Sequence, residues 1–343
     1  VRGDQGTPDP DLGPPERASG ARTLVAAVSG HGELVLPPGH YRFTFARGPE
    51  WDAVTVRVDV SHAPRAQLEA RLHHLFPMPE WTGCDLHVHS APSGDSRVSV
   101  ADRVAELVSV GVQYAAATEH NHVGDYTAAV RALDERAPRA AHGFAWSSAV
   151  EITTPTDGHF NAYPFPRDNS RPDGRPPIHW VPPSVFFREV RERAPDAVIQ
   201  VNHPRMSPGI GHFDQAGLDT ARNVAAHPEM YDPGYDVIEV FNGYYLQHVA
   251  ETERTLGDWF QLLRSGARYS GTASSDSHWV AFSQAGFPRT YVSTPSGGPV
   301  DGVRVARAVR EGRAFGTSGP LLFASVEGAA PGDGEVSRRD RAR

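Results

Sequence analysis

The chain has 343 residues, which predicts one large domain and a smaller one. Hydrophobic residues make up 39% and charged residues 22%, as in a globular protein rather than a fibrous or membrane-spanning one. The formal charge is −8, which argues against a nucleic-acid polymer as partner, because such a partner requires a basic face. The single cysteine, Cys84, excludes an internal disulfide framework and a cysteine-rich zinc site, so the 17 histidines are the feature to explain.

The composition and residue pattern of the N-terminal segment predict two parts. Residues 1–20 are rich in Pro, Gly and charge and have no hydrophobic periodicity, which predicts a disordered tail. Residues 21–79 predict a small antiparallel β-domain, because short β-branched or aromatic runs alternate with turn signals. The strands of this domain are expected at residues 23–28, 33–36, 41–45 and 54–60. No basic segment followed by an apolar run is found, so a cytoplasmic protein is expected, or a secreted one if a signal peptide was removed.

From residue 80 to residue 322, strand and helix patterns alternate, and residues 323–343 are expected to form a C-terminal tail. Helices are expected at residues 100–110, with Ser99 as the N-cap, and at residues 127–136, 184–193, 248–265 and 303–311. Strands are expected at residues 85–89, 112–118, 144–152, 197–202, 237–242 and 268–274. Repeated βα units imply a parallel sheet, and about seven of them favour a closed barrel, in which the chemistry lies where strands end.

Histidines and carboxylates stand at nearly every predicted strand end. Two-residue alternation puts Asp85, His87 and His89 on one face of their strand. The other strand ends supply Asp95, His120, Glu151, His159, His203, Asp276 and His278. Any one of these residues alone is weak evidence for a metal site. Together at one rim, however, their like charges and their burial would cost free energy unless cations lay between them. Nitrogen and carboxylate ligands without thiolates suit Zn, Mn or Fe.

These motifs, in this order, resemble the motif set of the polymerase and histidinol phosphatase (PHP) metallohydrolases, from about Gly83 to Pro320. The runs DLHVHS, GHFNAY and TSGP are most similar to the carbaryl-hydrolase-like (CehA/McbA) branch, in which a β-module often precedes the barrel. The resemblance implies an α/β fold with a distorted (β/α)7 PHP barrel, here preceded by the small antiparallel β-domain.

The resemblance also implies a trinuclear site with two to three divalent ions and with Glu151 as the bridging ligand. It divides the ligands into three groups: His87, His89, Glu151 and Asp276; Glu151, His159 and His203; and Asp95, His120 and His278. Adjacent divalent ions lower the pKa of a bridging water towards about 7 and polarise a substrate oxygen. A serine or cysteine nucleophile is then unnecessary.

Three further residues have two interpretations each. Glu119 is expected to support the ligands, with a direct ligand role as the alternative. His122 either orients the substrate and donates a proton or is an exposed loop histidine. Arg205 either contacts a substrate anion or pairs with a loop carboxylate such as Asp214.

Two long insertions, residues 163–183 and 204–235, are typical of lids or binding walls. Their aromatic residues and those nearby suggest an apolar pocket, whereas helix packing is the expected role of the two adjacent phenylalanines. The residues concerned are Trp180, Phe186, Phe187, Phe213, Tyr231, Tyr244 and Tyr245.

The expected function is a metal-dependent hydrolase in which metal-bound hydroxide cleaves a small phosphoester (mono- or diester), carbamate or carboxyl ester. The partner is then a small-molecule substrate, with no nucleic-acid polymer and no membrane. The alternative is a catalytically weak PHP scaffold that acts as a binding module through its β-domain. Filled ligand positions argue against this alternative. The oligomeric state is left open.

Overall fold

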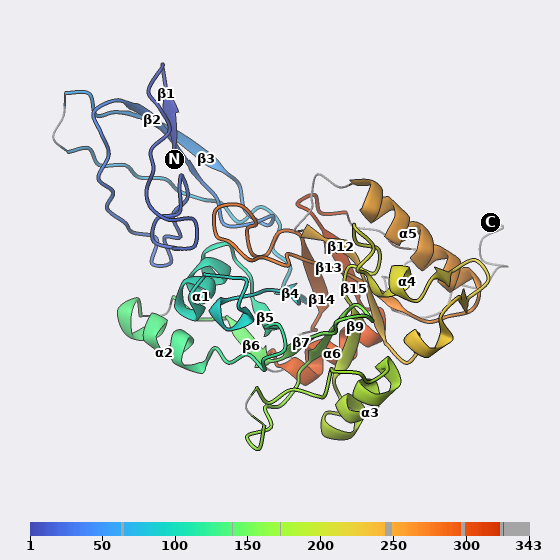
Figure 1. Ribbon diagram of the computed structural model, residues 1–343. Coiled ribbons are helices and arrows are strands. Elements are labelled where there is room, and N and C mark those ends of the chain that lie inside the picture. Colours follow the sequence, from blue (N-terminus) through green and yellow to red (C-terminus); the bar gives the residue numbers. More distant parts are fainter. Residues whose placement is uncertain are drawn as a thin grey trace.

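The computed structural model describes residues 1–62, 65–138, 140–171, 173–243, 249–295, 299–322 and 325. It has a small N-terminal antiparallel sheet beside a larger body in which helices surround two mixed sheets (Figure 1). Within this described part, no helix is both long enough and apolar enough to cross a membrane. The predicted C-terminal tail falls almost wholly outside the described residues.

The small sheet has the order β1-β2-β3 and all its pairs are antiparallel, as predicted. Its strands are β1 (Arg2–Asp4), β2 (His40–Phe45) and β3 (Val54–Asp59). The strands expected at residues 23–28 and 33–36 are absent from the structure.

The prediction of a disordered tail at residues 1–20 is wrong. Gly3 pairs with Tyr41 in the sheet, and the Val1 amino group donates a hydrogen bond to the Thr23 carbonyl at 2.7 Å. A three-residue strand satisfies its backbone through a partner that is distant in sequence, so it needs no hydrophobic periodicity of its own.

The larger body contains two five-stranded sheets, with the orders β15-β14-β4-β5-β6 and β13-β12-β9-β8-β7. The first contains β4 (Trp81–Asp85), β5 (Tyr114–Ala117), β6 (Ala145–Ser148), β14 (Arg289–Ser293) and β15 (Ala314–Thr317). The second contains β7 (Val150–Thr153), β8 (His159–Tyr163), β9 (Val198–Val201), β12 (Val237–Asn242) and β13 (Ser270–Ser274). A separate hairpin pairs β10 (Leu218–Asp219) with β11 (Val224–Ala225).

The prediction of a closed barrel of parallel strands is corrected in two respects. In the described residues the strand pairing does not close into a barrel. The strands β8, β14 and β15 run antiparallel to their neighbours, and the sequence reading missed all three. Backbone hydrogen bonds instead join the two sheets at two seams. The amide of Asp276 donates to the His87 carbonyl at 2.8 Å, and the amide of Glu151 donates to the Glu119 carbonyl at 3.0 Å. Both seams lie at predicted ligands.

Five helices agree with the predicted bounds to within one residue at each end, whereas the short helix His212–Gln215, in the insertion at residues 204–235, was not predicted. The helices are α1 (Val100–Ser109), α2 (Thr127–Arg136), α3 (Pro183–Arg193), α4 (His212–Gln215), α5 (Val249–Arg264) and α6 (Gly302–Arg310). Short 3₁₀ turns cover Ala91–Ser93 and Pro228–Met230. At the start of α1, the Ser99 hydroxyl accepts a hydrogen bond from the Asp102 amide at 3.0 Å, which is the cap expected there.

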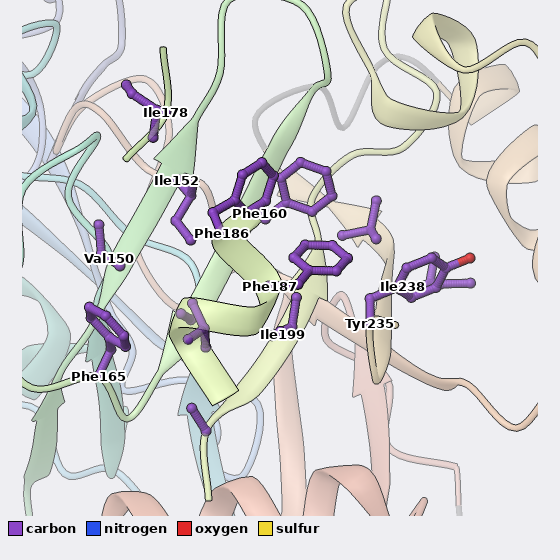
Figure 2. Packing of buried hydrophobic residues seen from close by; sticks show 14 of the residues in the cluster. Val150, Ile152, Phe160, Phe165, Ile178, Phe186, Phe187, Ile199, Tyr235 and Ile238 are labelled. Carbon is purple, nitrogen blue, oxygen red and sulfur yellow. The ribbon is translucent and has the colours of Figure 1, made fainter. Parts of the chain in front are cut away.

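The core on one side of the second sheet is aromatic. Phe160 of β8 packs against Phe186 and Phe187 of α3, with ring centroids 5.3 and 5.2 Å away (Figure 2). Phe213 of the α4 helix is buried in the same cluster, so these side chains belong to the hydrophobic core. Trp180, by contrast, is 96% exposed. The predicted Tyr244 and Tyr245 lie outside the described residues.

Candidate metal centre

The nine predicted ligands come together where strands of both sheets begin or end. His87 and His89 follow β4, His120 follows β5, His203 follows β9, and Asp276 and His278 follow β13. Glu151 lies within β7, and Asp95 follows the turn after His89. His159 begins β8. Because β8 is antiparallel to β9, the start of β8 lies beside the end of β9, where the Asn202 amide donates to the His159 carbonyl at 3.0 Å.

Glu151 is the centre of this arrangement and is fully buried. Its Oε1 lies 3.2 Å from His87 Nε2, 3.2 Å from His159 Nδ1 and 3.7 Å from His203 Nε2. Its Oε2 lies 2.5 Å from His120 Nδ1 and 3.6 Å from His89 Nε2. One carboxylate therefore faces five histidines from four separate chain segments.

Asp276 forms a second focus beside Glu151. Its Oδ1 lies 3.0 Å from His89 Nε2 and 3.3 Å from His87 Nε2. Its backbone has a φ of +46°, a left-handed conformation that non-glycine residues seldom adopt. His203 (φ +26°) and Asn121 (φ +51°) share this feature. Such backbone strain clusters at functional sites, where surrounding contacts hold it in place.

Asp95 forms the third focus. Its Oδ2 lies 3.2 Å from Nε2 of both His120 and His278. The rings of His120 and His278 each stack on His89, with centroids 4.3 and 4.2 Å away. The three imidazoles thus form a cluster, since His120 and His278 lie 5.6 Å apart, and the Asp95 carboxylate lies between these two rings.

The charges in the centre shift each other's pKa strongly. Burial alone would raise the pKa of Glu151, but the neighbouring histidines His120, His87 and His159 hold it well below its usual range. Burial opposes protonation of His120, yet Glu151 and Asp95 raise its pKa to about 10. The pKa of His89 moves the other way, because burial and its two charged histidine neighbours lower it. The centre is therefore electrostatically coupled throughout.

The hydrogen bonds on the outer ring nitrogens leave the inner nitrogens available as ligands. The Ser93 hydroxyl donates to Glu119 at 2.5 Å, so it accepts from His89 Nδ1 at 2.9 Å. His278 Nδ1 donates to the Asp276 carbonyl at 2.9 Å. In both rings Nε2 then points its lone pair into the centre, as metal ligands do.

These residues fit a divalent metal on two grounds. First, several buried ring nitrogens have no hydrogen-bond partner, namely His87 Nε2, His89 Nε2, His159 Nδ1 and His203 Nδ1. Such atoms are costly unless something satisfies them. Second, neighbouring donor atoms are separated by 3.0–3.3 Å at the Asp276 focus, near the ~3.3 Å expected between ligands of a tetrahedral zinc with bonds of about 2.0–2.1 Å.

Four buried or partly buried triads have ligand atoms within 4.8 Å of one another, as a multinuclear divalent site requires. They are His89, His120 and His278; His87, Glu151 and His203; His87, His89 and Asp276; and His120, Glu151 and His159. The triad of His87, His89 and Asp276 contains three of the four residues in the first predicted ligand group. The expected pairing of His159 with His203 differs from these triads, which place each of the two with Glu151 and a different histidine.

Glu119 occupies the supporting position expected of it. Its carboxylate accepts a hydrogen bond from the Ser90 amide at 2.8 Å and also contacts the Ser90 hydroxyl. Through Ser93 it holds His89, and the His120 amide donates to the same Ser93 hydroxyl at 3.1 Å.

His122 and Arg205 make polar contacts with residues outside the predicted ligand set. His122 is partly exposed at the rim, with Nε2 3.3 Å from a guanidinium nitrogen of Arg167. The Arg205 guanidinium donates to Asp258 at 2.7 Å, to Asp214 at 3.2 Å and to the Leu218 carbonyl at 2.7 Å. These contacts match the pairing with Asp214 that the sequence offered as the alternative to substrate binding.

Two buried charged residues of the site were missed by the sequence reading. Arg103 of α1 donates to the His89 carbonyl at 2.7 Å, and Glu239 of β12 lies 2.9 Å from His87 Nδ1. The available signal was a charged residue within an otherwise apolar run, as in VIEV around Glu239.

Neither a family model nor a curated protein matches the chain. Among solved structures, PsfC from Pseudomonas syringae is 16% identical with a TM-score of 0.44, over 73% of this chain and 94% of that chain. A candidate metal-dependent phosphoesterase from Bifidobacterium adolescentis is 14% identical with a TM-score of 0.40, over 60% and 91%. An amidohydrolase from Chromobacterium violaceum is 13% identical with a TM-score of 0.34, over 57% and 87%. The proposed function therefore rests on the geometry of the site.

Proposed function

We propose that this protein is a metal-dependent hydrolase that cleaves a small phosphoester, carbamate or carboxyl ester. The observation that supports this most directly is the buried Glu151 carboxylate, which faces five histidines from four chain segments. The nine predicted ligands would hold two to three divalent ions of Zn, Mn or Fe. When bound, such ions lower the pKa of a coordinated water towards about 7 and polarise the substrate oxygen.

The protein's own residues supply orientation and charge. Asn202 donates to Glu151 Oε1 at 2.8 Å and to Asn161 at 2.9 Å, which fixes the carboxylate plane. Asn121 exchanges two hydrogen bonds with the Thr153 backbone and so holds the segment that carries His120. His122, at the rim, is proposed to orient the substrate or donate a proton to the leaving group.

The contacts of Arg205 help to decide which substrate class is proposed first. A phosphoryl transition state gains from a cation near its oxygens, whereas a tetrahedral carbon needs mainly the metal ions. Because Asp258 and Asp214 both engage the Arg205 guanidinium, a role on a substrate anion would require breaking buried ion pairs. Carbamates and carboxyl esters are therefore proposed first, and phosphoesters second.

The test is an assay of protein stripped with chelator and refilled with Mn or Zn. Substrates are 1-naphthyl N-methylcarbamate, p-nitrophenyl acetate, p-nitrophenyl phosphate and bis(p-nitrophenyl) phosphate. Glu151→Gln should lose nearly all metal-dependent activity. Glu135→Gln, a matched change at a side chain 73% exposed on α2, should retain it. Activity on the phosphates alone would reverse the order of substrates.

Elemental analysis separates the enzyme from the scaffold alternative. The refilled wild-type protein should hold at least two metal ions per chain. Less than one ion per chain, with no hydrolysis of any of the four substrates, would favour a binding module that works through the β-domain.

A further inference from the structure

Glu239 is a buried acid that belongs to none of the predicted ligand groups. It lies in β12 between apolar neighbours and is 1% exposed. Its carboxylate accepts from three groups: His87 Nδ1 at 2.9 Å, the His203 amide at 2.9 Å and Asn242 Nδ2 at 3.0 Å. Burying a carboxylate is costly, and these three donors compensate for it.

The contact with His87 decides which ring nitrogen can bind a metal. A proton on Nδ1 directed at Glu239 leaves Nε2 as the nitrogen that faces the centre, 3.2 Å from Glu151 Oε1 and 3.3 Å from Asp276 Oδ1. A carboxylate behind a histidine ligand fixes the tautomer and the ring orientation and increases the basicity of the other nitrogen.

The contact with His203 acts on the backbone. His203 has a φ of +26°, and its amide points at Glu239 Oε2. A residue in this sparsely populated region needs surrounding contacts to hold it. Glu239 provides one of them and so helps to direct the His203 ring, whose Nε2 lies 3.7 Å from Glu151 Oε1.

Asn242 extends the connection to a third ligand. Its side-chain amide donates to Glu239 and also to Asp276 Oδ2, both at 3.0 Å. A single carboxylate in β12 is thus connected to ligands that follow β4, β9 and β13.

We propose that Glu239 is a positioning residue that sets the metal affinity of the centre by fixing the His87 tautomer and the His203 backbone together. This inference rests on the proposed metal centre but is independent of which ester is cleaved. Loss of such a partner typically weakens metal binding 10–100-fold.

The test is Glu239→Gln in the full chain, with the Zn²⁺ dissociation constant measured by competition with a chromophoric chelator. The variant keeps the side-chain volume, but its NH₂ group turns a donor towards groups that are themselves donors. We expect roughly 10–100-fold weaker zinc binding. The matched control is Asp236→Asn, just before the same strand, where the carboxylate accepts from Arg191 and the Ile199 amide, both at 2.8 Å. It should bind zinc like the wild type.

A second readout reports on the tautomer itself. In zinc-loaded protein with ¹⁵N-labelled histidine, the wild type should show a protected Nδ1–H signal that disappears in His87→Gln. In Glu239→Gln this signal should shift or be lost, a result that a merely structural role would not produce. If Glu239→Gln does not fold, Glu239→Asp takes its place, since it keeps the charge but withdraws the carboxylate from His87.

Three outcomes separate this inference from the proposed function. Zinc affinity within about twofold of wild type in the folded variant, or an equal loss in Asp236→Asn, overturns the role of Glu239. A wild type that binds no zinc overturns the metal centre and this inference with it. A wild type that binds zinc with an affinity sensitive to Glu239, but hydrolyses no ester, overturns only the proposed activity.

Discussion

The guanidinium of Arg103 donates to Ser277 twice, at 2.7 Å to the hydroxyl and at 3.0 Å to the carbonyl oxygen, although 174 residues separate the two. The same side chain donates to the His89 carbonyl at 2.7 Å. Arg103 is fully buried. It therefore joins the segments that follow β4 and β13, which between them carry four of the predicted ligands.

Replacing Arg103 with Met should destabilise the protein by about 3–5 kcal/mol, because it leaves the buried Glu106 carboxylate without its cation. Urea unfolding of the chelated protein measures this change. The double variant with Glu106→Gln should be less destabilised than Arg103→Met alone, since it removes the stranded charge. Equal destabilisation of the two variants would contradict this account of Arg103.

Asp95 offers a way to empty one part of the centre. Its side chain is 55% exposed and faces His120 and His278. Asp95→Asn should lower the metal content by about one ion per chain, because it removes the carboxylate that faces both histidines. Inductively coupled plasma mass spectrometry gives the metal content. Asp125→Asn, at an exposed loop position, is the control and should keep the full content.

Removing metal should lower the thermal stability. Without cations, the charges of the buried carboxylates and histidines are balanced only by the protons that these groups bind. A metal ion that binds the folded state but not the unfolded state stabilises the protein by RT ln(1 + [L]/Kd). At a free metal concentration of 100 Kd this amounts to about 2.7 kcal/mol. Thermal unfolding with EDTA, and after addition of excess Zn or Mn, measures the difference. An unchanged Tm would argue against a folded-state metal site.

His212 should make stability depend on pH outside the metal centre. Burial lowers its pKa to about 4, although the hydrogen bond to the Asp157 carbonyl opposes this shift. Because the folded state disfavours the charged ring, the stability that His212 contributes is present above the unfolded-state pKa of about 6.5 and is lost as the pH falls towards 4. The loss is ~3 kcal/mol at most.

The measurement compares urea unfolding of wild type and His212→Asn at pH 7.5 and pH 4.5, both with chelator present. The asparagine can still donate to the Asp157 carbonyl but cannot titrate in this range. The variant should lose less stability on acidification than the wild type. Parallel losses in the two proteins would show that His212 has no part in the acid sensitivity.

The role of Arg205 can be determined by measuring the stability and the catalytic activity of the same variant. If Arg205 has a structural role through its ion pairs with Asp258 and Asp214, Arg205→Met should lower the free energy of unfolding by about 3 kcal/mol. It should also lower the activity on carbamate and phosphate substrates equally. The control Arg222→Met removes a guanidinium whose side chain is 82% exposed and should cost almost nothing. A stable variant with kcat/KM reduced only for phosphates would restore the role on a substrate anion.

The local pattern predicted much of the secondary structure. α2 and β12 have the predicted bounds, and α1 begins at the predicted cap, because periodicity, caps and turn residues act within a few positions. The run at residues 144–152 was predicted as one strand, but the chain passes from one sheet to the other at Ala149 and divides into β6 and β7. Periodicity within a strand does not reveal such a change of partner.

The sequence by itself predicted the nine candidate ligands, because the rule that places polar residues at strand ends depends only on the order of elements along the chain. Only the tertiary structure decided how those side chains are held. Glu239 orients His87 across 152 residues and Arg103 binds Ser277 across 174, and no local pattern specifies such partners. The antiparallel strands β8 and β14 likewise depend on long-range pairing. These contacts arise when distant segments meet, so their energies appear only in the folded chain.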